Sequence, residues 1–423
     1  MTWLIVGAGP AWLAAMRAFK QAGIPWAAVE SHADVGGQWL HGAANSAVYD
    51  STHLISSKGT TAFMDFPMPE SWPPYPHHAH IGQYMRDFAR HFDLYPGIRF
   101  NTTLTRLSRA GEQWRAEFSD GSSEIFAGAV IANGHLSEPN IPDLPGDFSG
   151  QLLHSKAYKS PDIFAGKRVL IVGAGNTGCD IVVDAVHRAS RVLWSLRGGN
   201  HFVPKFVAGK PADAGNHNRR FVLPRWLRSR LHEAVLRILV GPPERFGLPK
   251  PQHRLYDRTP IVNSLVLQHL GQGDVDVRPP IQRLDGDQVV FEDGRREAVD
   301  IVLLATGYRT VFPFIDKAEL NWRDPAPHLY LNIFPPGGKN LFVAGLLEGA
   351  GIGWPGRDLQ AQAIAAFIAA PADKRAAFER NIAAYCAAPR PADAGDHGIF
   401  VDFQEYKQIL LKAISALSRH PGQ

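Results

Sequence analysis

The residues most suited to chemistry in this 423-residue sequence lie in two glycine-rich turns. The first turn follows an apolar stretch at 3–6 and consists of Gly7, Ala8, Gly9, Pro10, Ala11 and Trp12. The first glycine permits a tight turn, and the second lets a pyrophosphate approach the backbone at the positive end of the following helix. This turn therefore predicts a dinucleotide-binding site.

An acidic residue indicates which dinucleotide the first turn prefers. Glu30 ends the next predicted strand, at 26–29, and lies 23 residues (30 − 7) after Gly7. A carboxylate there accepts hydrogen bonds from ribose hydroxyls and repels a 2′-phosphate, so FAD, or NAD, is expected rather than NADP. Trp12 stands where a third glycine usually allows the helix to pack closely on the strand, and we expect its indole to displace the helix.

The second turn follows an apolar stretch at 168–172 and repeats the full pattern as Gly173, Ala174, Gly175, Asn176, Thr177 and Gly178. The next predicted strand ends without an acid, and Arg197 lies 24 residues (197 − 173) after Gly173. A guanidinium there suits the 2′-phosphate of NADP, and the Ser195 hydroxyl can add a hydrogen bond. The alternative is a solvated surface arginine. One acidic and one basic site together predict FAD and NADPH.

The elements that position these turns predict an α/β fold with two Rossmann-like dinucleotide-binding domains. Strands expected at 300–304 and 341–344 indicate that the chain returns to its first domain near the end. We therefore expect the NADPH domain to be inserted into a discontinuous FAD domain. The expected limits are 1–160 and 300–423 for the FAD domain and 161–299 for the NADPH domain, with a helical insertion at about 205–260.

Composition excludes several other classes of protein. The net charge is +4 with no Lys/Arg run, and no nucleic-acid-binding motif is present, so no nucleic-acid partner is expected. The two cysteines form no Cys-x-x-Cys, which disfavours a dithiol reductase and fits a cytoplasmic location. No apolar run has membrane-spanning length, so no membrane partner is expected. Three histidines at 77–80 lack accompanying acids, so no metal is expected.

The linker before the second turn resembles one family specifically. It contains Phe148, Gly150, His154 and Tyr158 in the spacing Phe-x-Gly-x-x-x-His-x-x-x-Tyr. This pattern is similar to the fingerprint of the flavin-containing monooxygenases, whereas the Baeyer–Villiger relatives place Trp where this chain has Tyr158. We expect the linker to cross between the two domains, with its His and Tyr fixing their mutual angle. A lone histidine such as His154 is more often structural than a general base.

Further motifs extend the resemblance over nearly the whole chain. The segment 36–39 is similar to a Gly-Gly-x-Trp motif near the flavin, and 51–67 resembles the loop that passes the isoalloxazine. The segment 305–308 resembles the Ala-Thr-Gly motif that returns the chain to the FAD domain, and 346–360 resembles the closing flavin turn. The resemblance implies cofactor-binding roles for Gly37, Gln38, Trp39, Asn176, Thr177, Asp180, Ala305, Thr306 and Gly307.

The sequence departs from the family pattern at Ile55, where many members carry an asparagine that is thought to contact the peroxide side of the flavin. Isoleucine donates no hydrogen bond, and Ser56, Ser57 or an NADP amide are the candidates to replace the amide. Ile55 and Ser56 are therefore assigned to the catalytic side of the flavin by position only.

The resemblance implies an FAD- and NADPH-dependent monooxygenase with O2 and a small molecule as its substrates. One oxygen atom would pass to a soft nucleophile, a nitrogen or sulfur centre, through a flavin C4a-hydroperoxide. Because the cofactor supplies the chemistry, no catalytic triad or carboxylate pair is needed. The alternatives are an NADPH oxidase or electron-transfer flavoprotein, Baeyer–Villiger oxygenation of ketones, and a binding module with a degenerate flavin fold. A homodimer is left open.

Overall fold

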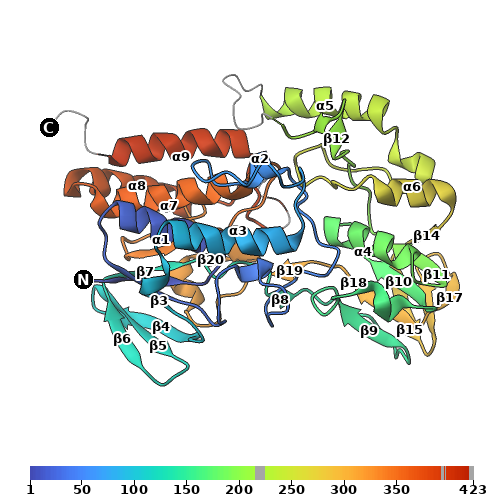
Figure 1. Cartoon of the computed structure of the whole chain (residues 1–423), viewed down its shortest axis with the longest axis horizontal. Coiled ribbons are helices and arrows are strands. Elements are labelled where there is room, and N and C mark those ends of the chain that lie inside the picture. Colours follow the sequence, from blue (N-terminus) through green and yellow to red (C-terminus); the bar gives the residue numbers. More distant parts are fainter. Residues whose placement is uncertain (215–223, 392–394, 396, 419–423) are drawn as a thin grey trace.

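The computed structural model describes residues 1–214, 224–391, 395 and 397–418, and two parallel five-stranded sheets organise them (Figure 1). The first sheet has the order β22-β7-β1-β2-β3, from Leu341–Val343, Gly128–Ile131, Trp3–Val6, Trp26–Val29 and Ile98–Arg99. The second has the order β14-β11-β10-β18-β9, from Val275–Arg278, Arg191–Ser195, Arg168–Val172, Ile301–Leu304 and Gln151–His154. Strands β1, β7 and β18 are buried along their whole length, as expected for parallel strands that are covered on both faces.

The residue ranges of the strands show that the segment forming the second sheet is inserted, in the sequence, between two segments that form the first. The first sheet takes its strands from 3–131 and 341–343, whereas every strand of the second lies within 151–304. The predicted fold class is therefore confirmed. The limits expected from the sequence placed β9 and β18 with the first sheet, but both hydrogen bond within the second, in the register Ile301↔Gln151 to Leu304↔His154. Their pairing depends on segments far apart in the chain, which a local sequence pattern does not record.

The helices lie beside the two sheets. They are α1 (Pro10–Gln21), α2 (Lys58–Thr61), α3 (His78–His91), α4 (Asn176–Val186), α5 (Arg225–Leu239), α6 (Leu265–Gln272), α7 (Gly353–Ala369), α8 (Ala372–Ala387) and α9 (Phe403–Leu417). Figure 1 shows α1, α3, α7, α8 and α9 gathered on the side of the first sheet, and α4 and α6 on the side of the second. The short 3-10 helices are Gly37–Trp39, Tyr95–Gly97, Pro161–Phe164, Pro243–Phe246 and Lys317–Leu320.

Smaller antiparallel sheets complete the architecture. One contains β4 (Leu104–Ala110), β5 (Gln113–Phe118) and β6 (Ser123–Phe126), and another contains β15 (Ile281–Asp285), β16 (Gln288–Phe291) and β17 (Arg296–Ala298). The two-stranded pairs are β8–β19 (Glu138–Pro139 with Tyr308–Arg309), β12–β13 (Phe206–Val207 with Lys210–Pro211) and β20–β21 (Trp322–Arg323 with Ala326–Pro327). Each three-stranded sheet directly precedes a parallel strand, β7 or β18, so the two halves of the fold repeat one plan.

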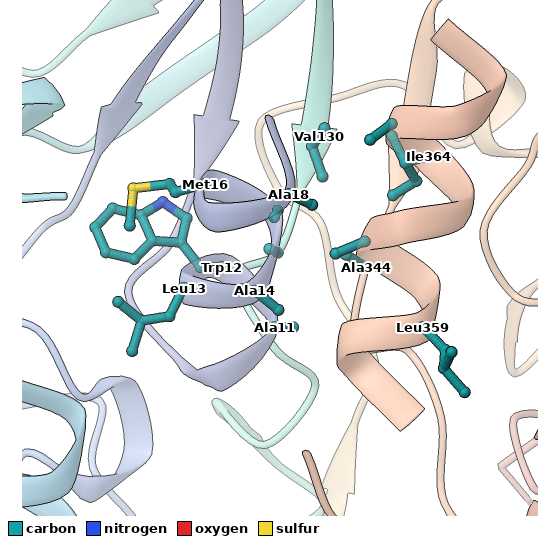
Figure 2. Packing of buried hydrophobic residues seen from close by; sticks show 14 of the residues in the cluster. Ala11, Trp12, Leu13, Ala14, Met16, Ala18, Val130, Ala344, Leu359 and Ile364 are labelled. Carbon is teal, nitrogen blue, oxygen red and sulfur yellow. The ribbon is translucent and has the colours of Figure 1, made fainter. Parts of the chain in front are cut away.

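Helix α1 packs through small side chains. Gly9 is its N-cap and Pro10 its first residue, a position where the missing amide proton of proline costs nothing. Figure 2 shows Ala11, Ala14 and Ala18 of α1 toward α7, while Trp12 and Met16 lie together on the side of α1 that faces away from α7. Alanine on the shared face lets the two helix backbones approach closely.

The C-terminal helix α9 packs on the protein through one apolar face. Its buried residues recur every three or four positions, at Phe403, Tyr406, Leu410, Ala413 and Leu417. The Tyr406 hydroxyl donates to the Leu331 carbonyl at 2.5 Å and accepts from the Gln360 amide of α7 at 2.7 Å. Within the described part of the chain, no helix combines the length and the hydropathy needed to span a bilayer.

Candidate functional site: two dinucleotide turns

The first glycine turn has the geometry of a phosphate-binding turn. Gly7 adopts φ +119°, and an added Cβ would lie 2.5 Å from the carbonyl oxygen of Ala132, so only glycine fits there. A Cβ added at Gly9 would meet no atom within 4 Å. The backbone at Gly9 therefore faces open space at the amino end of α1, where a pyrophosphate can approach.

The turn at 36–39 lies directly against Gly9. The Gly36 amide donates to the Ala8 carbonyl at 2.9 Å, and a Cβ added at Gly37 would lie 2.7 Å from the Cα of Gly9. The Gln38 amide holds neighbouring loops, because it donates to the carbonyls of Asn45 and Leu136 and accepts from the amide of Ala47. Trp39 is half-buried against the core of the first sheet.

Glu30 directly follows β2, as the sequence predicts, and its carboxylate is buried. Its Oε1 accepts hydrogen bonds from the His32 amide at 2.8 Å and from the Ser31 hydroxyl at 3.0 Å, and it lies 2.7 Å from the His32 Nδ1. All these contacts use the same oxygen. The carboxylate is thus fixed beside the carboxyl end of β1, where ribose hydroxyls bind in this type of fold.

Trp12 is accommodated in the core. Its side chain is fully buried, and its Nε1 donates to the Ile5 carbonyl of β1 at 3.3 Å. The matching residue of the second turn is Gly178, whose added Cβ would lie only 2.4 Å from the Gly173 carbonyl oxygen. The first helix thus has room for a side chain that the second lacks, and the indole occupies its space without closing the space at Gly9.

Two buried polar atoms beside the first turn lack hydrogen-bond partners among the described residues. They are Oδ1 of Asn133 and Nδ1 of His135, both in the loop that follows β7. The Cα of Asn133 lies 3.0 Å from a Cβ added at Gly7, so this loop forms part of the turn's wall. Sequence reasoning missed both residues, and the available signal was their place just after a fully buried strand.

The second turn repeats the geometry of the first. Gly173 has φ +122°, and its added Cβ would lie 2.3 Å from the Ala305 carbonyl oxygen. A Cβ added at Gly175 would meet no atom within 4 Å. Gly175 caps α4, so its open side again faces the amino end of a helix.

Asn176 and Asp180, which we expected to bind the cofactor, hold loops against α4. The Asn176 amide donates to the Pro260 carbonyl at 3.2 Å, and its oxygen accepts from the Val262 amide at 2.8 Å. Asp180 accepts from the hydroxyl of Tyr49 and from the amide of Asn263. Burial raises the Asp180 pKa despite these hydrogen bonds. Thr177 is half-buried in the first turn of the helix.

Of the two residues expected to bind a 2′-phosphate, one has a side chain available to a ligand and the other does not. Ser195 is 2% exposed, and its hydroxyl donates to the Pro279 carbonyl at 2.9 Å, so its single proton is already used within the protein. Arg197 follows the end of β11 and is exposed. Among the described residues it makes no hydrogen bond or ion pair, so its guanidinium is available to an anion.

The linker residues His154 and Tyr158 connect the two halves of the fold. The His154 Nε2 lies 3.0 Å from the Gly307 carbonyl and its Nδ1 accepts from the Lys156 amide at 3.1 Å, so both nitrogens have structural partners. Burial lowers the His154 pKa and keeps the ring neutral. The Tyr158 hydroxyl donates to Asp184 of α4 at 2.7 Å, and its ring packs on Tyr49 with centroids 5.3 Å apart. The expectation that His154 is structural agrees with these contacts.

The segment 305–307 lies between the two sheets. The Thr306 hydroxyl donates to the Asn140 carbonyl at 2.6 Å, and the Asn140 amide donates to the Gly307 carbonyl at 2.9 Å. The Ala305 carbonyl lies so close to Gly173 that no side chain fits at position 173. These residues therefore shape the second turn and join it to the strand pair β8–β19.

A cavity of about 550 Å³ lies next to the residues expected on the catalytic side. Ser57 lines this cavity, whereas Ile55 and Ser56 do not. Ile55 is 36% exposed, and the Ser56 hydroxyl is 2.7 Å from that of Thr61. Its lining is mainly apolar: Ser57, Lys58, Gly59, Thr60, Ala62, Phe63, Met64, Pro67, Met68, Pro74, Pro211, Ala214 and Pro355.

His77 and His78 serve the local structure. The His77 side chain caps α3 by accepting from the Ala79 amide, and its Nε2 lies 2.6 Å from the Asp50 carbonyl. His78 is buried and stacks on His41 with ring centroids 4.6 Å apart. Over the residues with described coordinates, no group of three or more His, Cys, Asp or Glu side chains is arranged to hold a metal ion.

Comparison with known proteins agrees with this architecture. The chain is 31% identical over 383 residues to dimethylaniline monooxygenase [N-oxide-forming] 2 of Pan troglodytes, covering 85% of this chain and 71% of that protein. Its fold resembles S-allyl-L-cysteine S-oxygenase from Allium sativum, with TM-score 0.68, 20% identity and coverage of 98% and 88% of the two chains. It also resembles cyclohexanone monooxygenase from Rhodococcus sp. Phi1 bound to NADP+, with TM-score 0.71, 18% identity and coverage of 98% and 97%.

The family match extends over most of the sequence. The flavin-binding monooxygenase-like family matches residues 2–373, which include both glycine turns, the linker and the closing turn. The Pan troglodytes relative exceeds 30% identity over most of this chain. The chain therefore belongs to the flavin-binding monooxygenase-like family of oxidoreductase enzymes.

Proposed function

We propose that this enzyme binds FAD at the first glycine turn and NADPH at the second, and transfers one oxygen atom of O2 to a sulfur or nitrogen centre of a small molecule. The observation that carries the proposal is the opposite charge beside two turns whose first two glycines have the same geometry. Glu30 stands at the end of β2 in the first, and Arg197 follows β11 in the second.

The residues of the first turn fit FAD. The open side of Gly9 admits a pyrophosphate, and the buried carboxylate of Glu30 accepts from ribose hydroxyls. The orphaned atoms of Asn133 and His135 offer further polar contacts at the same turn. A buried polar atom without a partner is costly, so a bound ligand that satisfies these atoms gains affinity.

The residues of the second turn fit NADPH. Gly175 leaves the amino end of α4 open to a pyrophosphate, and the exposed guanidinium of Arg197 suits a 2′-phosphate. Ser195 contributes its backbone, since its carbonyl accepts from the Gly173 amide at 3.1 Å. The preference for NADPH over NADH thus rests on Arg197.

The bound cofactors supply hydride transfer and oxygen activation, and the residues of the chain orient the reactants and exclude water. The contacts of Tyr49, Ser51 and Tyr158 with α4 fix the second turn relative to the first. His154 is neutral and held at both nitrogens, so it positions the linker and does not transfer protons.

The cavity beside Ser57 suits a neutral sulfide better than a protonated amine. Its lining, as far as the described residues show it, contains no carboxylate, and its two methionines, Met64 and Met68, are polarizable and apolar. The Lys58 ammonium donates to the carbonyls of Pro69, Glu70 and Trp72, so it lies in the neighbouring loop as a fixed positive charge. A second cation in such a cavity would be disfavoured.

An NADPH oxidase is the second candidate, because Ile55 places a hydrocarbon where the family resemblance implies an amide. Oxygenation of a ketone is the third, since one structural neighbour is a cyclohexanone monooxygenase. Tyr158 stands against this third candidate, because the Baeyer–Villiger relatives place Trp at that position.

The test is a single-turnover experiment with ¹⁸O2. The purified enzyme is reduced with NADPH without oxygen and then mixed with ¹⁸O2 in the presence of a thioether, a tertiary amine or a cyclic ketone. We expect one ¹⁸O atom in the sulfoxide, with less N-oxide and no lactone. Stoichiometric hydrogen peroxide without a labelled product would instead establish the oxidase.

A further inference from the structure

The loop 132–136 lies where three segments of the first site converge. A Cβ added at Gly7 would lie 2.5 Å from the carbonyl oxygen of Ala132. The Gln38 amide donates to the Leu136 carbonyl at 3.3 Å. The Nε2 of His135 lies 3.5 Å from a carboxylate oxygen of Glu348. The loop therefore touches the phosphate turn, the 36–39 turn and the segment that follows β22.

Two buried acceptors in this loop point to a ligand. The His135 side chain is 10% exposed, and its Nδ1 has no partner among the described residues. The Asn133 Oδ1 is also buried without a described partner. Because Nε2 of His135 faces the carboxylate of Glu348, it carries a proton, and in the neutral tautomer Nδ1 is then the acceptor that has no partner.

Glu348 is held in place from several sides. Its backbone amide donates to the Ile399 carbonyl at 3.0 Å, and its carbonyl accepts from the Val401 amide at 2.9 Å. Burial by itself would raise the Glu348 pKa, but the contacts with His135, His397 and Arg357 outweigh burial and hold that pKa below its usual value. The carboxylate therefore stays ionised and holds the proton of His135 on Nε2.

The strand order indicates which half of the cofactor meets this loop. In the order β22-β7-β1-β2-β3, the carboxylate of Glu30 lies at the end of β2, on one side of the phosphate turn of β1. His135 follows β7 and Glu348 follows β22, both on the other side. A dinucleotide that places its adenosine ribose at Glu30 and its pyrophosphate over Gly9 extends its second half toward β7 and β22.

We propose that His135 and Asn133 accept hydrogen bonds from the flavin half of bound FAD, and that Glu348 is a positioning residue that orients the His135 ring. This inference rests on the proposed FAD site. The flavin half carries ribityl hydroxyl groups and a ring N–H, which are the donors that two buried acceptors require. The adenosine half lies away from both residues.

The experiment measures FAD and ADP binding to the full chain after removal of flavin. FAD binding is followed by quenching of flavin fluorescence, and ADP binding by calorimetry. His135→Phe removes both ring nitrogens and is expected to weaken FAD binding on the order of tenfold, with ADP binding unchanged. His135→Gln retains an acceptor oxygen and is expected to recover part of the affinity. Glu348→Gln and Asn133→Ala are expected to weaken FAD binding by smaller factors.

Control measurements separate this role from a structural one. The melting temperature of each flavin-free variant reports folding, and His91→Phe, an exposed histidine of α3, serves as the matched substitution. An FAD dissociation constant for His135→Phe and Asn133→Ala within about twofold of the unchanged chain would overturn the inference. Equal losses of FAD and ADP binding would also overturn it, because the defect would then lie in the turn itself. Failure of the unchanged chain to bind FAD would instead refute the proposed function.

Discussion

Ser51 and Tyr158 donate hydrogen bonds to the same carboxylate oxygen, Oδ2 of Asp184, at 2.6 and 2.7 Å. Ser51 belongs to a loop of the first half of the fold, Tyr158 to the linker, and Asp184 to α4 of the second half. One side chain of α4 thus holds two segments that precede it in the chain. Burial raises the Tyr158 pKa, so the phenol remains a donor throughout the pH range of folding studies.

Removal of the Tyr158 hydroxyl is expected to disturb the fixed angle between the two sites. Hydrogen bonds to charged groups contribute about 1.5–3 kcal/mol, so Tyr158→Phe should lower the free energy of unfolding by up to that amount. We also expect slower anaerobic reduction of the flavin by NADPH, with unchanged FAD affinity. Tyr95→Phe is the matched control, because Tyr95 donates to Asp34 within the first half of the fold. Equal reduction rates in the two variants would contradict this role for Tyr158.

Trp12 is expected to contribute to stability and not to impair FAD binding. Its indole is fully buried, so Trp12→Ala should lower the free energy of unfolding by about 3–5 kcal/mol in denaturant titrations. Trp226→Ala, at a residue that is 54% exposed, should change it by less than about 1 kcal/mol. If Trp12→Phe bound FAD more tightly than the unchanged chain, the view that Trp12 leaves the first site intact would be wrong.

Arg197 is expected to set the preference for NADPH over NADH. Loss of a charge-assisted hydrogen bond costs about 1.5–3 kcal/mol, so Arg197→Ala should raise the KM for NADPH by about 10–150-fold and leave that for NADH nearly unchanged. Arg191→Ala, at the start of β11, is the control, because Arg191 is paired with Asp276 and Glu297. Parallel increases of both KM values in Arg197→Ala would assign Arg197 to general binding of the cofactor.

Ile55 is expected to shorten the time for which NADPH-reduced enzyme retains activated oxygen. Ile55→Asn introduces the amide that the family resemblance implies, so oxidised-flavin absorbance should return more slowly after reduced enzyme is mixed with oxygen. Less hydrogen peroxide should be released per NADPH consumed. Ile55→Leu keeps a hydrocarbon of similar size and should behave like the unchanged chain. Identical rates in Ile55→Asn and Ile55→Leu would show that position 55 has no influence on this step.

His78 is expected to make stability depend on pH. Burial, together with the nearby His77, His41 and His53, lowers its pKa to about 4, while Asp50 opposes them. Because the folded pKa lies below the unfolded value of about 6.5, the folded state loses stability as the pH falls from about 6.5 to 4. The free energy of unfolding of His78→Gln should decline less steeply over this range. Parallel curves for both proteins would contradict the assignment.

Local patterns predicted the two turns because each element there is defined by adjacent residues. The strands at 26–29 and 168–172 appear with the expected bounds, and a helix follows Gly9 as expected, since apolar runs and glycines encode these elements directly. The side-chain partners were less accessible to sequence reasoning. Ser195 was assigned to a phosphate, but its hydroxyl donates to Pro279, which only the neighbouring strand β14 brings near.

The contacts of His135 show the same limit. Its partner Glu348 lies more than two hundred positions along the chain, and the pair forms only because β7 and β22 are adjacent in the sheet. No periodicity in the sequence records that adjacency. The motif at 305–307 was predicted as a return to the first sheet, and its carbonyl contact with Gly173 became visible only with the register of β18 against β10.

The strand pair β8–β19 has a mechanical consequence. The chain leaves the first sheet through 138–139 and returns through 308–309, and these two crossings hydrogen bond to each other as antiparallel neighbours. The second half of the fold is thus attached by a ribbon of two strands, which resists stretching and shear more strongly than two separate strands would. The hydrogen bonds of Ser51 and Tyr158 to Asp184 join the two halves at a second place, so a rotation about the ribbon would have to stretch or break them.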